Sequence, residues 1–227
     1  MKIGIILTPN SRSNAYLRKL LELKIELADI VFMNDKSVHA FSHEEISKST
    51  EYGFDISDSI ESILRKSNLD YTEFNFVNIN EPELINHVQT KSIDYYIFTG
   101  GGILKEDILN SGSKFLHFHP GIVPEYRGST CFYYSILKQN FCGVTAFIMD
   151  ENLDAGNIIH QKTFSKPNHI FLDNVYDAHI RAETMGEIFT NNLLYNQKLT
   201  KQNLDDGETY FIIHPVLKHI SILSCIE

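Results

Sequence analysis

Short apolar runs alternate with stretches of helical periodicity through the first two-thirds of the chain, and this alternation most constrains its fold. The apolar runs are Lys2–Thr8, Asp29–Asn34, Tyr71–Ile79, Asp94–Gly100 and Lys114–Gly121. Between the first two runs, Leu17, Leu20, Leu21 and Ile25 repeat at helical spacing. Strands that alternate with helices in this way predict right-handed βαβ units. We therefore expect an α/β fold with a mostly parallel, Rossmann-like sheet and helices on both faces.

Outside these runs the chain is predicted to contain three further strands, a long helix and one polar segment. Gly143–Asp150 and Asn157–Phe164 are two β runs joined by a short turn, and Thr209–Lys218 resembles a final strand. The long helix carries an apolar stripe formed by Val175, Ala182, Met185, Phe189 and Leu193. The polar stretch Asp35–Asp58 is interpreted as a loop or lid before a helix at Ile60–Lys66.

Composition excludes several classes of function. The net charge of −9 argues against a nucleic-acid partner, which usually requires a clustered basic surface. No segment approaches the roughly 20 apolar residues of a membrane helix, and the N-terminal apolar run is too short for a secretory signal. Three cysteines, Cys131, Cys142 and Cys225, lack metal or redox spacing. These features predict reduced thiols in a cytoplasmic protein with no membrane partner.

Three of the predicted strands end in chemically rich sequence. "TPNSRSN" follows the first strand, "FTGGGIL" follows the Asp94 strand, and the Lys114 strand ends in "HFHPG". In open α/β sheets, ligands bind outside the carboxyl ends of the strands. We therefore expect these three segments to contribute to one site.

The two histidines of the third segment leave three interpretations open. Alternation along a strand places His117 and His119 on the same face. They are then satisfied core histidines, zinc ligands or catalytic groups. Zinc needs a third protein ligand and an organised second set of contacts. Because no Cys or carboxylate stands at a diagnostic offset, we predict no metal.

The segments "HFHPGIVPEYRG" and "GVTAFIMDENLDAGNII" together resemble the folate-dependent formyltransferases. This family includes glycinamide ribonucleotide, methionyl-tRNA and sugar N-formyltransferases. Its members carry Asn-x-His before a proline, and later an Asp in a Leu-Asp-x-Gly turn. His119 and Asp154 match the family's catalytic histidine and aspartate, at about the usual spacing. The resemblance implies a formyltransferase-like catalytic domain over residues 1–195, with residues 196–227 as a C-terminal extension packed on the same domain.

One position departs from the family pattern. The family's asparagine, which donates to the formyl oxygen as it becomes an oxyanion, is replaced by His117. Neutral imidazole donates one hydrogen bond and imidazolium donates two. We therefore include His117 with His119 and Asp154 as the catalytic residues, and the loss of an oxyanion donor typically costs on the order of 100- to 1000-fold in rate.

The resemblance also implies the ligands and their binding residues. The co-substrate would be 10-formyltetrahydrofolate, and its pterin would contact two loops, whose residues are Phe98, Thr99, Gly100, Gly101, Gly102, Ile103, Leu104, Asp150 and Leu153. The acceptor would contact Asn10, Ser11, Arg12, Pro120, Gly121, Tyr126, Arg127 and Gly128. For Asn10 to Arg12, simple helix capping competes with an anion site. For Arg127, a structural contact that bridges the loop competes with a ligand contact.

The acceptor is predicted to be a small amine. The first loop lacks the Gly-Ser-Gly-Ser-Asn pattern of the glycinamide ribonucleotide enzymes, whereas "HPGIVPEYRGST" is closer to the sugar enzymes. A nucleotide-linked amino sugar is therefore expected. Two alternatives are a hydrolase that releases formate from the same folate and a non-catalytic folate- or ligand-binding protein. Self-association into a homodimer is left open.

Overall fold

The computed structural model describes residues 1–37, 39–195 and 199–226. The chain forms two compact units, residues 1–117 and residues 118–227. Strand β5 (Lys114–His119) begins in the first unit and ends in the second. None of the helices in the described residues combines the length and the apolar character that crossing a bilayer requires. The predicted division at residue 195 stays a prediction.

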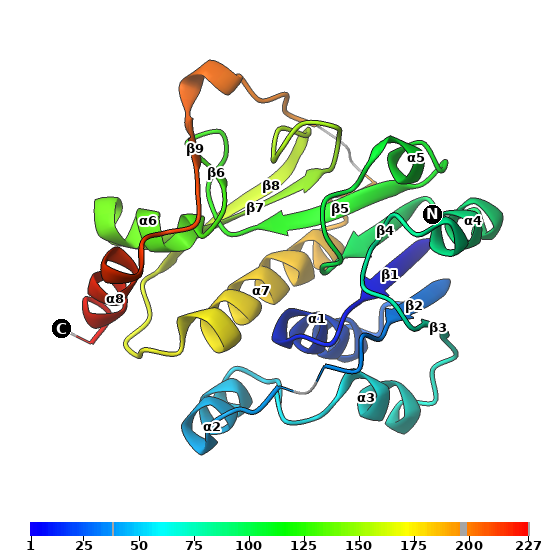
Figure 1. Cartoon of the computed structure of the whole chain (residues 1–227), viewed down its shortest axis with the longest axis horizontal. Coiled ribbons are helices and arrows are strands. Elements are labelled where there is room, and N and C mark those ends of the chain that lie inside the picture. Colours follow the sequence, from blue (N-terminus) through cyan, green and yellow to red (C-terminus); the bar gives the residue numbers. More distant parts are fainter. Residues whose placement is uncertain (38, 196–198, 227) are drawn as a thin grey trace. The chain divides into compact units, whose positions relative to one another are not determined.

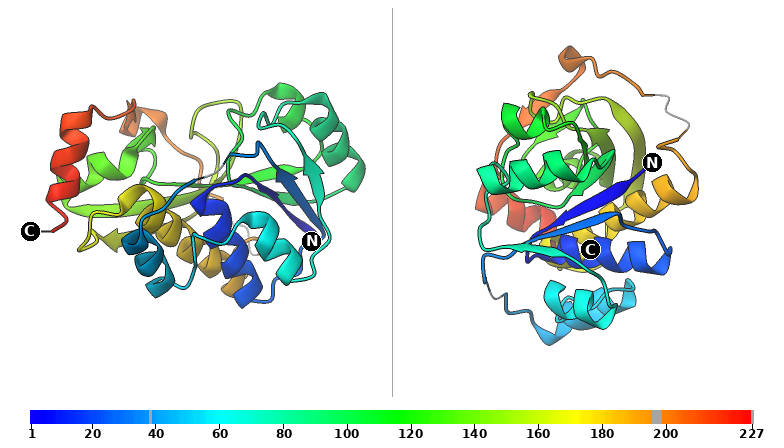
Figure 2. Two further views of the ribbon diagram at one scale, coloured as in Figure 1. Left: turned by 60° about the horizontal axis from the view of Figure 1, so that its bottom comes forward. Right: turned by 90° about the vertical axis from the view of Figure 1, so that its right-hand side faces the viewer.

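The first unit is built on parallel strands in the order β3-β2-β1-β4-β5 (Figure 1). The strands are β1 (Ile3–Leu7), β2 (Asp29–Met33), β3 (Thr72–Phe74), β4 (Tyr95–Phe98) and the start of β5. The helices are α1 (Ser11–Glu22), α2 (His43–Glu51), α3 (Ile60–Lys66), α4 (Pro82–Lys91) and α5 (Glu106–Leu109). Figure 2 shows α1 and α3 on one side of these strands and α4 and α5 on the other. The predicted α/β fold is confirmed.

The central strands are buried because helices cover both of their faces. Every residue of β1, β2 and β4 is buried, as expected of a parallel strand in a doubly covered sheet. Gly4 allows close packing here, since a Cβ at this position would lie 2.5 Å from a ring carbon of Tyr96. Asn10 begins α1 as its N-cap, and its side-chain oxygen accepts from the backbone N–H of Ser13 at 2.8 Å.

Two predictions for the first unit are corrected. The stretch Asp35–Asp58 is not only a loop or lid, because it contains α2. A capping box begins that helix: Ser42 accepts from the Glu45 N–H, and the Glu45 carboxylate accepts from the Ser42 N–H. The predicted strand Tyr71–Ile79 is shortened to β3, which pairs only with β2 at the edge of the sheet.

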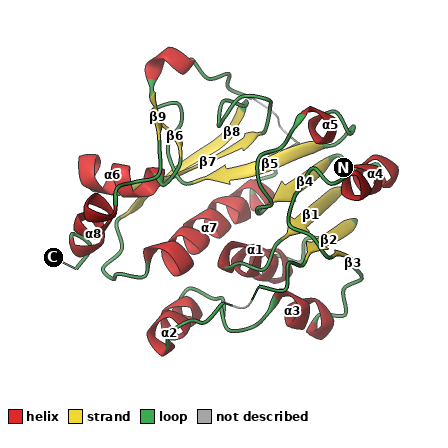
Figure 3. Ribbon diagram, in the orientation of Figure 1, coloured by secondary structure: helices red, strands yellow, loops and turns green. Residues whose placement is uncertain are grey.

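The second unit contains an antiparallel pair, β7–β8, and a short parallel pair, β6–β9 (Figure 3). The strands are β6 (Tyr126–Gly128), β7 (Phe141–Ile148), β8 (Ile158–Ser165) and β9 (Glu208–Tyr210). The helices are α6 (Cys131–Gln139), α7 (Asp177–Thr190) and α8 (Pro215–Leu223), with a π-helical turn at Leu172–Tyr176 and a 3-10 turn at Leu204–Asp206. The predicted β7–β8 pair is confirmed. The long helix is also present, but Val175 lies in the π-helical turn before α7 and Leu193 lies beyond its end.

The prediction of a final strand over Thr209–Lys218 is wrong for most of its length. Strand β9 ends at Tyr210, and α8 begins at Pro215. Proline favours the first helical position because its fixed φ suits the helix and its missing N–H would be unpaired there. His214 caps the helix, since its Nδ1 accepts from the Val216 N–H at 3.3 Å.

Candidate active site

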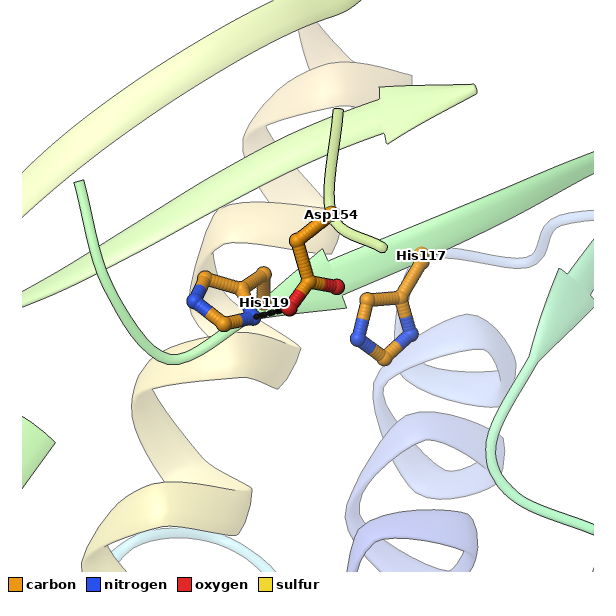
Figure 4. A group of neighbouring side chains, drawn as sticks. All are labelled: His117, His119 and Asp154. Carbon is orange, nitrogen blue, oxygen red and sulfur yellow. Dashed lines mark ion pairs between the residues drawn. The ribbon is translucent and has the colours of Figure 1, made fainter. Parts of the chain in front are cut away.

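A buried histidine and a carboxylate form the centre of the candidate site. His119 ends β5, and Asp154 lies in the turn between β7 and β8. The Nδ1 atom of His119 lies 3.4 Å from Oδ2 of Asp154 (Figure 4). His119 is 1% exposed, and the Asp154 side chain is 10% exposed. The predicted convergence of these two residues is therefore present within the second unit.

Hydrogen bonding fixes the tautomer of His119. Its Nε2 lies 2.8 Å from the backbone oxygen of Tyr126. A carbonyl oxygen only accepts, so Nε2 carries the hydrogen and donates it. In the neutral ring Nδ1 then bears a lone pair, and Nδ1 is the atom beside the Asp154 carboxylate. The ring is held as a proton acceptor at Nδ1.

Burial lowers the pKa of His119, because the protein interior disfavours the imidazolium. The Asp154 carboxylate acts in the opposite direction and raises the pKa, while Arg181 lowers it further. The imidazole is accordingly neutral at physiological pH. A proton that arrives at Nδ1 during a reaction is stabilised by the adjacent carboxylate.

Two glycines set the backbone around this pair. Gly128 adopts a φ of +100° and donates its N–H to Oδ2 of Asp154 at 2.9 Å. A Cβ on Gly121 would lie 2.6 Å from the Tyr126 oxygen and 2.9 Å from Nε2 of His119. A side chain at position 121 would therefore displace the carbonyl that fixes the histidine.

Other predicted residues of the second unit have structural contacts. Arg127 donates from Nη2 to the backbone oxygen of Leu204 at 3.0 Å, as the loop-bridging interpretation predicts. The Tyr126 ring is fully buried and stacks on Tyr210 at 5.4 Å between centroids. Pro120 is buried, and Asp150 accepts from the Asn152 N–H at 2.9 Å. Their assignments to a ligand stay predictions.

The predicted pterin loop of the first unit follows β4. Phe98 and Thr99 are buried, and the Thr99 hydroxyl donates to the Ile6 oxygen at 2.8 Å. Three glycines follow with φ values between +97° and +156°, at positions Gly100, Gly101 and Gly102. Ile103 is 77% exposed, while Leu104 is buried. Positive φ explains why glycine occupies these positions.

His117 and the first loop also lie in the first unit. The half-buried His117 ring is 6.2 Å from the Phe98 ring. Asn10 and Ser11 line a cavity of about 380 Å³, which also contacts Phe32 and Phe41. Arg12 is not among the residues that line this cavity. The capping role of Asn10 is confirmed by its hydrogen bond to the Ser13 N–H, and the acceptor contacts of this loop stay predictions.

Metal-binding side-chain types are present at this site. His117 and His119 stand two positions apart on β5, and together with Asp154 they are side chains of the kinds that ligate zinc. Nε2 of His119 and Oδ2 of Asp154 already have protein partners, Tyr126 and Gly128. The prediction that no metal is used stays a prediction.

Comparisons with known proteins agree with the site motif. Methionyl-tRNA formyltransferase from Finegoldia magna is 24% identical over 149 residues, which are 63% of this chain and 48% of that protein. The sequence model described as formyl transferase matches residues 31–184. The chain belongs to the formyl transferase family. It spans about half the length of the curated relative from Finegoldia magna.

Solved structures share the fold of this formyl transferase family member. A sugar N-formyltransferase from a Shewanella species matches with a TM-score of 0.59 at 15% identity, covering 99% of this chain and 88% of that chain. The N-formyltransferase from Helicobacter canadensis, solved with folinic acid and dTDP-3-aminofucose, matches with a TM-score of 0.60 at 13% identity. That match covers 100% of this chain and 80% of the other.

Three residues of this family member that support the histidine and the aspartate were not among the predicted site residues. Arg181 donates from Nη1 to the Phe118 oxygen at 2.9 Å and pairs with Asp177 at 2.8 Å. Asp177 and Arg181 stand at i and i+4 on α7, and this spacing could have indicated the ion pair from the sequence. The third residue, Gln202, donates from Nε2 to the backbone oxygen of Asp154 at 3.0 Å. No sequence pattern indicates this contact.

Proposed function

We propose that this protein transfers a formyl group from 10-formyltetrahydrofolate to the amine of a small acceptor. The observation that carries the proposal is the pairing of His119 with Asp154 at 3.4 Å, in a tautomer that leaves Nδ1 as a proton acceptor. Membership of the formyl transferase family supports the same chemistry. General base catalysis by a histidine of this kind contributes typically 10²- to 10⁴-fold.

The reaction requires one new C–N bond and two proton movements. The acceptor amine attacks the formyl carbon and forms a tetrahedral intermediate with a negative oxygen, toward which His117 would donate. The amine loses its proton to Nδ1 of His119, and the resulting imidazolium is held between the Tyr126 carbonyl and the Asp154 carboxylate. The bond from carbon to the folate N10 then breaks, and that nitrogen takes the proton. The products are a formamide and tetrahydrofolate.

The exposed apolar residues support a folate as co-substrate. In the first unit, Ile103 is 77% exposed after the glycine run, and in the second unit Leu153 is 57% exposed beside Asp154. Both belong to the residues predicted to contact the pterin, a planar heteroaromatic ring whose faces can pack on apolar side chains while its nitrogens, amino group and oxo group form hydrogen bonds. We therefore assign these two loops to folate binding.

A nucleotide-linked amino sugar is the acceptor that we favour. The similar enzyme from Helicobacter canadensis was solved with dTDP-3-aminofucose, whereas the similar curated protein from Finegoldia magna is a methionyl-tRNA formyltransferase. Binding of tRNA relies on neutralising many phosphates with lysine and arginine. This chain carries a net charge of −9, which favours a small acceptor over a tRNA.

The test is release of tetrahydrofolate from 10-formyltetrahydrofolate with and without a panel of dTDP- and UDP-linked amino sugars. We expect release that depends on one of these acceptors, with the formamide product visible by mass spectrometry. Release without any acceptor would indicate hydrolysis and contradict transfer. Release only with charged methionyl-tRNA would contradict the sugar acceptor. Folate that binds without turnover under all conditions would contradict catalysis.

A further inference from the structure

The segment after β9 exposes an unusual amount of apolar surface. We define the C-terminal apolar surface by its exposed side chains, which are Phe211, Ile212, Val216, Leu217, Ile220, Leu223 and Ile226. Their exposed fractions range from 41% to 80%. They make up half of the large apolar side chains that are exposed in the described residues. Such clustering is typical of an interaction site rather than of scattered surface residues.

Helix α8 presents this surface on one side and packs on α6 with the other. Val216, Ile220 and Leu223 stand at i, i+4 and i+7, which places them on one helical face. Ser221 is buried on the opposite side and donates to the Tyr133 oxygen of α6 at 3.3 Å. Figures 1 and 2 show α8 beside α6, close to the described end of the chain. The outward face is thus a continuous apolar stripe.

Area and charge together indicate the occupant. Seven large apolar side chains in one segment, each at least 41% exposed, exceed the scattered apolar residues of an ordinary surface, and the largest apolar patch on a typical monomer is only ~300–600 Å². A standard protein interface buries ~800 Å² per partner. From Phe211 to Ile226 the only charged residue is Lys218, and it pairs with Asp173 at 2.5 Å.

Two copies of a chain with net charge −9 repel each other over most of their surface. The segment from Phe211 to Ile226 contains no Asp or Glu, so two copies can approach there with less of that repulsion. We propose that this surface binds a second copy of the chain, related by a two-fold axis, with α8 packed against the α8 of its partner. In such an isologous contact the same apolar residues are buried on both copies.

The test is sedimentation velocity of the full chain across a wide range of protein concentrations. We expect a dimer for the wild type, and a monomer for Ile220→Asp because two carboxylates would be buried at the contact. Ile170→Asp is the matched control, since Ile170 is 47% exposed and Ile220 is 49% exposed. It should remain dimeric. Val216→Asp provides a second variant, and circular dichroism confirms folding of each. A wild-type monomer, or a dimer that folded Ile220→Asp and Val216→Asp leave intact, would overturn the proposal.

A separate observation concerns Gln202, which clamps the turn that carries Asp154. Its Nε2 donates to the backbone oxygens of Asp154 at 3.0 Å and of Gly156 at 2.7 Å. Asp154 has a φ of +50°, which is uncommon for a residue other than glycine. Gly156 is packed so tightly that a Cβ there would lie 1.8 Å from the Ile148 oxygen. The two bonds therefore brace a turn whose backbone is constrained on both sides of Asp154.

We infer that Gln202 is a positioning residue that keeps the Asp154 carboxylate directed at His119. The expected fall in kcat rests on the proposed function, whereas the expected movement of the Asp154 carboxylate does not. Gln202 is 8% exposed and comes from the predicted C-terminal extension. Loss of its two hydrogen bonds leaves two carbonyls without a donor and lets the turn relax, so the carboxylate moves away from Nδ1.

The test compares Gln202→Leu with Gln161→Leu. Gln161 also donates from Nε2 to two acceptors, Val123 at 2.6 Å and Thr145 at 3.2 Å, but not to the Asp154 turn. For Gln202→Leu we expect kcat to fall ~10- to 100-fold. An NMR titration of the His119 ring should show a lower pKa, because the carboxylate that raises it has moved. Gln161→Leu should leave that pKa in place.

The NMR arm separates this inference from the proposed function, because it requires no turnover. If the wild type transfers no formyl group, the shift in the His119 titration still tests the clamp. An unchanged His119 titration in folded Gln202→Leu would overturn the inference. A fall in kcat with no change in the titration would assign Gln202 to another structural role and would overturn it as well.

Discussion

Replacement of Asp154 by Asn is expected to lower the kcat of formyl transfer by at least about 100-fold. The amide has nearly the same size, and its oxygen can still accept from the Gly128 N–H, so the turn should persist. It carries no charge to stabilise the imidazolium that forms at His119. The amide oxygen that accepts from Gly128 takes the Oδ2 position, 3.4 Å from Nδ1, where it stabilises an imidazolium less than a carboxylate does.

The pH dependence of the same variant gives a second readout. Asp154 raises the pKa of His119 against the lowering effect of burial. Without the carboxylate the pKa falls further, and the neutral ring survives to lower pH. The acid limb of the kcat profile should therefore move to lower pH in Asp154→Asn, measured with saturating co-substrate and acceptor. Near-normal turnover, or an acid limb that moves to higher pH, would contradict the assignment of this pair.

Replacement of His119 by Gln is the second change with a large expected effect. We expect kcat to fall by at least about 100-fold, since an amide cannot accept the amine proton at neutral pH. The Gln side chain can still donate to the Tyr126 oxygen, which limits the structural damage. His160→Gln is the matched control, because His160 Nε2 also faces a carboxylate, Glu187, at 3.0 Å. Turnover of that variant should remain close to wild type.

Although His119→Gln should lower kcat, it should make the folded protein more resistant to acid. The pKa of His119 in the folded protein lies below its ordinary value of about 6.5, so unfolding takes up a proton as the pH falls below that value. The wild type therefore loses stability from about pH 6.5 down to the folded-state pKa. The Gln variant lacks this loss. Urea denaturation at pH 7.5 and pH 5 measures the difference, and an equal acid loss in both proteins would contradict a neutral buried imidazole.

The fold was largely predictable because parallel strands that are buried on both faces require long apolar runs. Lys2–Thr8 and Asp29–Asn34 stand out in sequence for that reason, and they contain β1 and β2. The prediction for the C-terminal segment Thr209–Lys218 was wrong because its apolar run suits either a strand or a helix. In the structure, His214 and Pro215 begin the helix. In the sequence, the β-like run before them favoured a strand instead.

The sequence by itself determined the chemical types at the site and the order in which the chain presents them. His119 and Asp154 were identified from their motifs, because the spacing of such motifs reflects a common fold. Only the tertiary structure decided how these groups work as a pair. Which nitrogen of His119 bears the proton depends on the Tyr126 carbonyl, and the orientation of Asp154 depends on Gly128 and Gln202. These partners are backbone atoms or distant side chains, and the folded chain alone brings them within hydrogen-bonding distance.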